Sequence, residues 1–301
     1  MTAPPSRPPL KMPPMAKPPA PSAGPAHVPK TFAVKAWTGA GEGKKILLYG
    51  PNGMGKTTLA SMAPNPIFIG FDDGGREIRN PKTGQPINAI PGVETFEDFR
   101  DALHQTTLFP TGATLVVDTI TLAEVRAINY LLRTVKTEGG KTPGNIEDYG
   151  WGKGFNLLLD PMRLLLADMD PLVRKGVNVI LLAQQGLGTV VNQAGLDYFQ
   201  DGPVLTSKPA KDTNVRSEYI GWCDNVFRIG YDDPTVEKAA KTATKGKATG
   251  TTARRIFTEP EVYFVAKNRM NGTLPPVVSF DTRDDDSIWR FLFGDLNGQA
   301  S

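Results

Sequence analysis

Short apolar runs recur along the first two thirds of this chain, and amphipathic stretches separate them. Four runs have the length and composition of strands that are buried on both faces: 46–49, 67–71, 113–117 and 177–183. Helical spacing predicts four helices between and after them: one starting near Gly55, then 96–107, 122–132 and 151–175. Strands that alternate with helices predict an open, mostly parallel α/β sheet flanked by helices, with ligands at its carboxyl edge.

The last third of the chain has a different pattern. Residues 184–216 show no periodicity and predict a long loop, and loops of this length inside a domain are usually functional or disordered. Further strands, expected to be antiparallel, and a final helix are predicted at 225–231, 255–257, 262–267, 277–280 and 288–293. The Lys-rich stretch 234–252 between them predicts a flexible, basic hairpin excursion.

Composition adds a tail and limits the class of protein. Residues 1–30 are rich in Pro and predict a disordered tail, which leaves 31–301 as one domain. The tail carries four basic residues and no acid, so the net charge of +3 leaves a nearly neutral body, and any contact with nucleic acid must come from local patches. The chain has one cysteine and no apolar run near the roughly 20 residues of a membrane helix, so we expect a soluble protein of the cytoplasm, or of the host cytoplasm if a phage encodes it.

A glycine-rich segment joins the first predicted strand to its helix. It satisfies the pattern G-x-x-x-x-G-K-[ST], and its residues are Gly50, Pro51, Asn52, Gly53, Met54, Gly55, Lys56, Thr57 and Thr58. In this pattern backbone N–H groups surround a phosphate, the lysine reaches the β- and γ-phosphates, and the hydroxyl after it binds Mg²⁺. The segment therefore predicts a nucleotide site, with ATP and Mg²⁺ as cofactors.

Polar residues at the ends of three other strands are candidates for the chemistry. Asp118 ends a buried strand, where P-loop enzymes hold Mg²⁺, although an ordinary helix-capping Asp would look the same. The next residue is Thr119, where many P-loop ATPases have a glutamate base, so the base must lie elsewhere. Asp72 or Asp73 could supply it, and Gln184 could sense the γ-phosphate.

Taken in order, these features resemble the RecA-type recombinase core, and in particular the short RecA-like ATPases of bacteriophages that include single-strand annealing recombinases. The segments that carry the resemblance are 50–58, 63–69, 73–75, 116–119, 149–154 and 176–183, and the resemblance spans about 43–281. It departs in two places. An Asp stands where a Glu is usual at the second strand, which predicts slow hydrolysis, and a Gln stands at 184 where many phage relatives have His.

The resemblance implies an ATP-hydrolysing protein that assembles on single-stranded DNA and promotes annealing or strand exchange. It implies that Gln184 switches between nucleotide and DNA loop, and that Lys267 and Arg269 act on the γ-phosphate of a neighbouring subunit in a homo-oligomer, with ring, filament and dimer left open. Segments 137–153 and 185–215 would be the DNA loops. Their aromatic and basic residues are Tyr149, Trp151, Lys153, Tyr198, Phe199, Lys208, Lys211 and Arg216, although core aromatics at loop ends would look the same. The basic residues Lys238, Lys241, Lys245, Lys247, Arg254 and Arg255 could guide a phosphate backbone or form a solvated face.

Two other functions remain open from the sequence. The weak catalytic carboxylate and the Pro-rich tail are also typical of a nucleotide-dependent module that recruits replication proteins, such as a single-strand-binding protein, with little turnover. A small-molecule kinase is the third possibility, but the Arg-rich lid expected after its fourth strand is not evident.

Overall fold

The computed structural model describes residues 33–34, 39–71, 73–192, 194–207, 214–232, 235–238, 246–249, 252–270 and 272–294. Residues 40–301 form one unit and residues 1–39 another. The predicted Pro-rich tail lies outside the described residues, as do Asp72 and most of the predicted excursion 234–252. In the described part of the chain, no helix is both long enough and apolar enough to cross a membrane.

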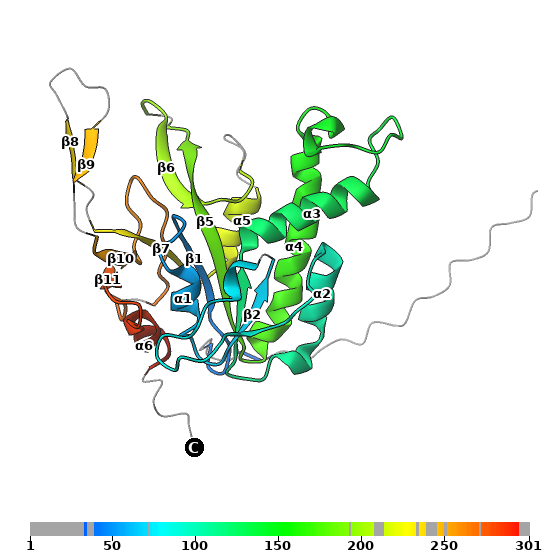
Figure 1. The fold of residues 1–301 in the computed structure, drawn as a ribbon. Coiled ribbons are helices and arrows are strands. Elements are labelled where there is room, and N and C mark those ends of the chain that lie inside the picture. Colours follow the sequence, from blue (N-terminus) through cyan, green and yellow to red (C-terminus); the bar gives the residue numbers. More distant parts are fainter. Residues whose placement is uncertain are drawn as a thin grey trace, which may run out of the picture. The chain divides into compact units, whose positions relative to one another are not determined.

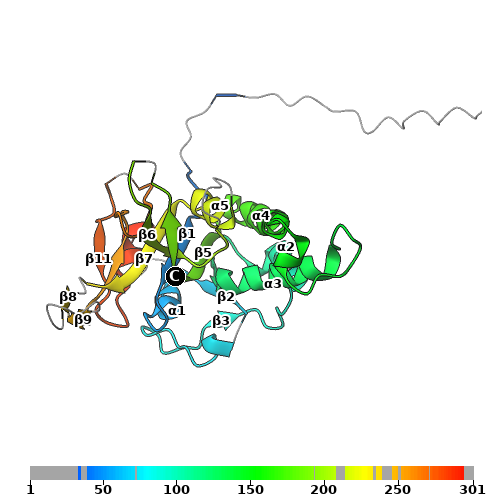
Figure 2. The same cartoon turned by 90° about the horizontal axis from the view of Figure 1, so that it is seen from above.

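A nine-stranded mixed sheet organises the described part of residues 40–301 (Figures 1 and 2). Its strands are β1 (Lys45–Gly50), β2 (Pro66–Gly70), β3 (Asn88–Ala89), β4 (Thr114–Asp118), β5 (Asn178–Val190), β6 (Tyr198–Pro203), β7 (Asn225–Tyr231), β10 (Arg254–Phe257) and β11 (Val277–Ser279). They follow the order β11-β10-β7-β1-β5-β4-β2-β3, with β6 paired to β5. The six strands from β7 to β3 pair in parallel, whereas β10 and β11 are antiparallel. The predicted fold class is confirmed, but β7, which was expected to be antiparallel, is parallel to its neighbour β1. A separate antiparallel pair, β8 (Thr235–Lys238) and β9 (Gly246–Thr249), lies in the stretch where the sequence predicted a hairpin.

Helices cover both faces of the sheet. They are α1 (Lys56–Ala60), α2 (Phe96–His104), α3 (Ile120–Thr134), α4 (Lys153–Arg174), α5 (Val215–Trp222) and α6 (Ser287–Phe293). Alternate residues of the central strands divide between two cores because successive side chains of a strand point to opposite faces. Leu47 and Leu181 pack with α2 to α5, whereas Ile46 and Ile180 pack with α1 and α6.

The helix ends follow the local sequence. Thr95 caps α2 as predicted, because its hydroxyl accepts from the Asp98 N–H while the Asp98 carboxylate accepts from the Thr95 N–H. Helix α4 continues through Pro161 and Pro171, which do not divide it. The helix after the glycine-rich segment is short, because α1 ends at Ala60.

The prediction of a loop over 185–215 is wrong in its first half. Strand β5 continues past Gln184 to Val190 and pairs with β6 in an antiparallel hairpin, which projects from the carboxyl edge of the sheet (Figure 1). Glycines interrupt the period-two pattern of this hairpin, and two of them lie against the side chain of Arg216. A Cβ at Gly188 or Gly202 would lie 2.2 or 2.0 Å from guanidinium nitrogens of Arg216.

The strand predicted at 262–267 does not form a regular ladder. This segment makes isolated bridges, between Asp201 and Phe264, between Val226 and Lys267 and between Glu261 and Phe264. It runs between the hairpin and β7, where its backbone satisfies groups of both elements.

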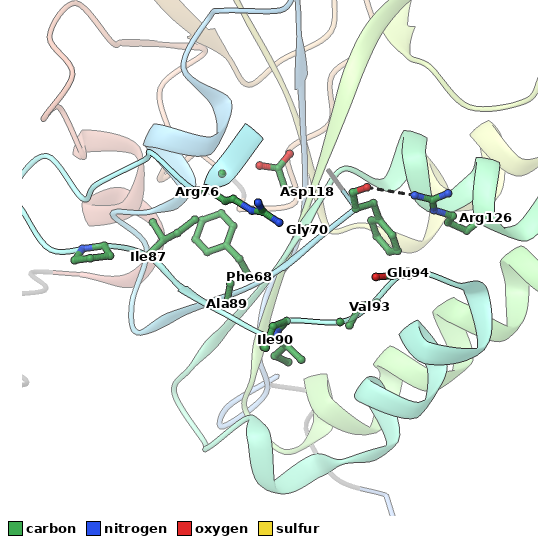
Figure 3. A pocket seen from close by; sticks show the side chains of 15 residues that line it. Phe68, Gly70, Arg76, Ile87, Ala89, Ile90, Val93, Glu94, Asp118 and Arg126 are labelled. Atoms are coloured by element: carbon green, nitrogen blue, oxygen red, sulfur yellow. Dashed lines mark hydrogen bonds between the residues drawn. The ribbon is translucent and has the colours of Figure 1, made fainter. Parts of the chain in front are cut away.

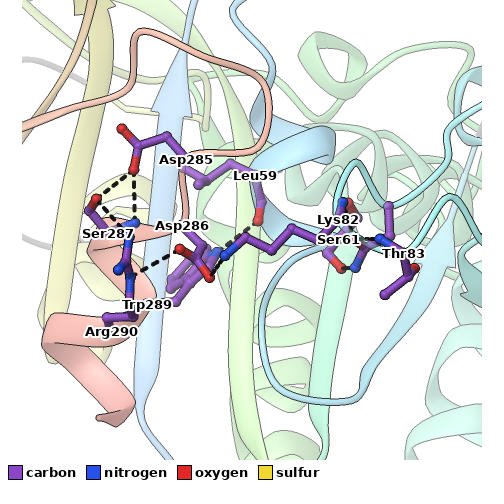
Figure 4. A network of polar contacts seen from close by, with 10 residues as sticks. Leu59, Ser61, Lys82, Thr83, Asp285, Asp286, Ser287, Trp289 and Arg290 are labelled. Atoms are coloured by element: carbon purple, nitrogen blue, oxygen red, sulfur yellow. Dashed lines mark hydrogen bonds and ion pairs between the residues drawn. The ribbon is translucent and has the colours of Figure 1, made fainter. Parts of the chain in front are cut away.

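The irregular segment between β2 and α2 is anchored to α1 and α6 (Figure 4). Asn80 donates from Nδ2 to the carbonyl of Ser61 (2.7 Å), and Lys82 forms an ion pair with Asp286. Trp289 of α6 donates to the carbonyl of Leu59 (2.7 Å). These contacts hold the segment and α6 against the helix that follows the glycine-rich loop.

Candidate nucleotide site

The loop from Gly50 to Gly55 lies at the carboxyl end of β1, between α1 and the neighbouring strands. Gly53 and Gly55 have φ of 78° and 92°, a region that side-chain-bearing residues rarely adopt. Pro51, Asn52 and Gly53 are exposed, so the loop can accept a ligand from solvent. The predicted phosphate loop therefore has the backbone shape that its motif requires.

Lys56 is buried beneath this loop. Its ammonium donates to the carbonyls of Gly50 (2.8 Å) and Pro51 (2.9 Å), so it points along the loop rather than away from it. Burial lowers the pKa of Lys56, and the nearby Asp118 carboxylate opposes this shift. The charge therefore lies where phosphate oxygens would approach the loop.

Thr57 and Asp118 form the predicted metal pair. The Thr57 hydroxyl, in the first turn of α1, donates to Oδ2 of Asp118, at the end of β4, at 2.7 Å. A hydroxyl and a carboxylate at this spacing suit Mg²⁺, which usually takes one or two protein oxygens and completes its shell with phosphates and water. In the described part of the chain, no group of three or more His, Cys, Asp or Glu residues could hold a metal ion.

The chain segment that leads to the two base candidates leaves the sheet where β2 lies beside β4. Gly70 pairs with Asp118, and the Phe71 N–H donates to the Asp118 carbonyl (3.1 Å), so the chain after β2 starts next to the metal pair. Asp73 begins a 3₁₀ helix there, whereas Asp72 lies outside the described residues. The choice between Asp72 and Asp73 as base stays a prediction.

Gln184 lies beside the start of the phosphate loop. It pairs in register with Gly50, the first residue of the phosphate loop, and its N–H donates to the Thr121 hydroxyl (3.2 Å). The strand continues from it directly into the β5–β6 hairpin. The sensor role itself stays a prediction.

Arg254 reaches the phosphate loop from β10, which the sequence did not reveal. Its guanidinium donates to the Met54 carbonyl (3.1 Å) and stacks over the Phe280 ring at 4.3 Å. A Cβ at Gly55 would lie 2.9 Å from its guanidinium, so Arg254 packs closely against the loop.

Arg255 instead pairs with Asp232 and Asp281. Arg254 and Arg255 are therefore anchored to the folded domain. The structure does not describe the side chains of the other basic residues of the predicted excursion, which are Lys238, Lys241, Lys245 and Lys247.

A cavity of about 360 Å³ lies beside the metal pair, at the outer edge of the sheet (Figure 3). Asp118 lines one side, and Arg76 and Arg126 bring two guanidinium groups to its wall. Arg126 donates to the Phe71 carbonyl (3.4 Å), and its buried Nε has no hydrogen-bond partner. Two cations at this wall suit an anionic ligand, and motif spacing could not have predicted them because they come from separate elements.

Lys267 and Arg269 lie away from the phosphate loop of their own subunit. They flank the start of β7 and β1, where Arg269 pairs with Asp224 (3.1 Å) and Lys45 approaches the same carboxylate (3.9 Å). The ammonium of Lys267 donates to the carbonyls of Ile220 (2.9 Å), Gly221 (2.9 Å) and Cys223 (2.6 Å), so it caps the end of α5. Five residues of strand separate this edge from Gly50, roughly 16 Å at the usual rise. The action of Lys267 and Arg269 on a neighbouring subunit stays a prediction, and Lys267 also binds the carbonyls at the end of α5.

The two aromatic residues of the first predicted DNA loop differ in burial. Tyr149 is buried and donates its hydroxyl to the carbonyls of Leu131 (3.0 Å) and Val135 (2.8 Å), so it is a core residue that caps α3. Trp151 is fully exposed, with a φ of 48°. Lys153 forms an ion pair with Glu138.

The second predicted loop places its residues on the hairpin and around it. Phe199 is 69% exposed and Tyr198 is half-buried. Arg216 is half-buried and packs against the hairpin glycines, and burial lowers the pKa of its guanidinium. Lys208 and Lys211 lie outside the described residues.

Comparison with known proteins identifies the family. The sequence matches the AAA domain family over residues 42–270. Among solved structures, the chain is similar to a KaiC-like protein of the hyperthermophilic archaeon Pyrococcus horikoshii OT3, at 13% identity and a TM-score of 0.38, over 81% of this chain and 88% of that one. No curated protein matches it. The family match spans the phosphate loop, the metal pair and the hairpin, so the chain belongs to the AAA domain family and carries a P-loop ATPase domain.

Proposed function

We propose that this protein binds and hydrolyses ATP and acts on single-stranded DNA, promoting annealing or strand exchange. The observation that carries the proposal is the course of β5, which pairs with the phosphate-loop strand at Gln184 and then forms the projecting hairpin. One strand thus connects the nucleotide site to a surface that could hold DNA.

At the nucleotide site, each residue has one task. Lys56 would neutralise the β- and γ-phosphates, and Thr57 with Asp118 would hold Mg²⁺, which would offset charge on the phosphates when bound. An Asp at the end of β2 would orient or deprotonate the attacking water. The exposed loop leaves one side of the bound nucleotide open, and a neighbouring subunit in a ring or filament would close it.

The hairpin offers the features that single strands favour. Phe199 is exposed on it, and Tyr263 of the adjacent segment is 50% exposed. Exposed rings provide stacking faces for bases whatever their sequence, at about 1–3 kcal/mol per base. The positive charge that such a surface needs would come from Lys208 and Lys211, which follow β6 in the sequence.

The test is steady-state ATP turnover with and without single-stranded DNA, with Lys56→Ala as the blank. We expect turnover to rise with DNA and to vanish in Lys56→Ala. Phe199→Ala should weaken DNA binding roughly tenfold, whereas Phe291→Ala, an exposed aromatic of α6, should leave it unchanged. Turnover that ignores DNA would contradict the proposal.

A second function is favoured by aliphatic side chains at the same hairpin. Leu187 is 72% exposed and Leu196, in the turn, is 91% exposed, which suits a protein partner better than a nucleic acid. In this case the protein would recruit a replication protein, such as a single-strand-binding protein, with little turnover. Capture of a purified single-strand-binding protein that depends on ATP and on Leu196, without DNA-stimulated turnover, would favour it.

A further inference from the structure

The first turns of α3 hold the base of the β5–β6 hairpin at two points. The Thr121 hydroxyl donates to the Val204 carbonyl (3.0 Å) and accepts from the Gln184 N–H (3.2 Å). Glu124, one turn later, accepts the Thr206 N–H with both carboxylate oxygens, at 2.8 and 3.1 Å. The two ends of the hairpin are therefore joined to one helix.

Thr121 stands where β5 leaves the sheet. Up to Leu182, β5 pairs with β4, whose last residue is Asp118. Beyond that point β4 no longer provides a partner, and the Thr121 hydroxyl takes the Gln184 N–H in its place. A hydroxyl can accept this hydrogen bond and donate another at the same time, which a methyl group cannot.

The same helix begins directly after the metal pair. Asp118, which accepts from Thr57, is three residues before Thr121 and two before the start of α3. Gln184, on the other side of Thr121, lies in register with Gly50. A movement of Asp118 would therefore be transmitted to Thr121 along the chain. A movement of the phosphate loop would be transmitted to Thr121 through Gln184 of β5.

We propose that Thr121 is a positioning residue that transmits the state of the bound nucleotide to the β5–β6 hairpin, with Glu124 fixing the same helix to the far end of the hairpin. The proposal rests on the nucleotide binding in the proposed function, but not on what the hairpin binds. A purely structural threonine would stabilise the fold without making the hairpin respond to nucleotide.

Hydrogen exchange of the hairpin amides tests this. Wild type, Thr121→Val and Thr121→Ser are each saturated with Mg²⁺ and either ADP or ATPγS. We expect exchange of the wild-type amides at 186–190 and 198–202, the paired hairpin strands, to differ between the two nucleotides by at least about fivefold, the lower end of usual coupling. Thr121→Val should lose this difference and Thr121→Ser should keep it.

Thr137→Val is the matched control. The Thr137 hydroxyl also donates to a backbone carbonyl and accepts a backbone N–H, both of Lys141, but in another loop. It should retain the wild-type difference. If Thr121→Val does not fold, Thr121→Ala replaces it in the same comparison.

The outcomes separate this proposal from the proposed function. A difference that persists in Thr121→Val, one that is lost in Thr121→Ser, or wild-type exchange that ignores the nucleotide would overturn the role of Thr121. If exchange follows these expectations but ATP turnover does not depend on DNA, the role of Thr121 is supported and the proposed function on DNA is contradicted.

Discussion

Replacing Lys267 by Met separates two roles that the same lysine could have. The sequence predicts that Lys267 acts on the nucleotide of a neighbouring subunit, whereas the structure joins its ammonium to three carbonyls at the end of α5. Met keeps most of the aliphatic stem and removes the charge and all three hydrogen bonds. The carbonyls of a helix end have no partners within the helix and need others.

The size of the effect follows from the exposure of these carbonyls. A hydrogen bond to a charged group contributes about 1.5–3 kcal/mol, but Gly221 is exposed and water can replace the lysine there. Cys223 is fully buried, so its carbonyl loses the most. We expect Lys267→Met to lower the free energy of unfolding by roughly 2–3 kcal/mol, and the melting temperature by roughly 4–10 °C.

Thermal unfolding and ATP turnover, measured well below the melting temperature, give the two readouts. Arg269→Met is the control, because its ion pair with Asp224 is largely exposed and should contribute less than about 1 kcal/mol. An unchanged melting temperature in Lys267→Met, together with lost turnover, would refute the capping argument and support action on a neighbouring subunit.

Three further predictions concern other parts of the molecule. Arg254→Met should weaken nucleotide binding roughly tenfold in a titration, because it removes the contact to Met54 behind the loop, whereas Arg255→Met should not. Trp289→Phe should lower the free energy of unfolding by about 0.5–1.5 kcal/mol, since it removes one hydrogen bond to the buried Leu59 carbonyl, which keeps the Met62 N–H. Burial raises the pKa of Glu124 from 4.5 to about 7, so the folded protein keeps a proton there that the unfolded chain loses. The free energy of unfolding of the wild type should therefore fall as pH rises from 4.5 to 7, by up to roughly 3 kcal/mol from this group, and Glu124→Gln should flatten that part of the curve in urea titrations.

The parts of the site that the sequence predicted are those in which local chemistry is decisive. The strand, glycine-rich loop and lysine are contiguous, and Asp118 follows an apolar run whose burial could be read directly. Their proximity then follows from the parallel order of β1 and β4, because parallel strands end at one edge. Arg126 and Arg254 could not be found in this way, since α3 and β10 bring them to the site from distant segments.

Tyr149 and Trp151 show why the surface was harder to predict than the site. Both are aromatic residues of one polar, glycine-rich segment, and composition treats them alike. In the structure Tyr149 caps α3 inside the core, and Trp151 is fully exposed two residues later. The difference comes from α3 and α4 packing on either side of Tyr149, which is a tertiary effect.

The β5–β6 hairpin was not predicted because its glycines and exposed apolar residues interrupt the strand pattern in the sequence. Gly188 and Gly202 interrupt the apolar pattern, yet their missing side chains make the space that Arg216 fills. Exposed Leu187 and Phe199 look like loop residues, because no face of the hairpin's tip is buried in the core. A strand that leaves its sheet loses the hydrophobic pattern by which strands are recognised. Here Thr121 and Glu124 hold the base of the hairpin from the helix that follows Asp118, so the segment that the sequence could not predict is also the one placed to respond to nucleotide.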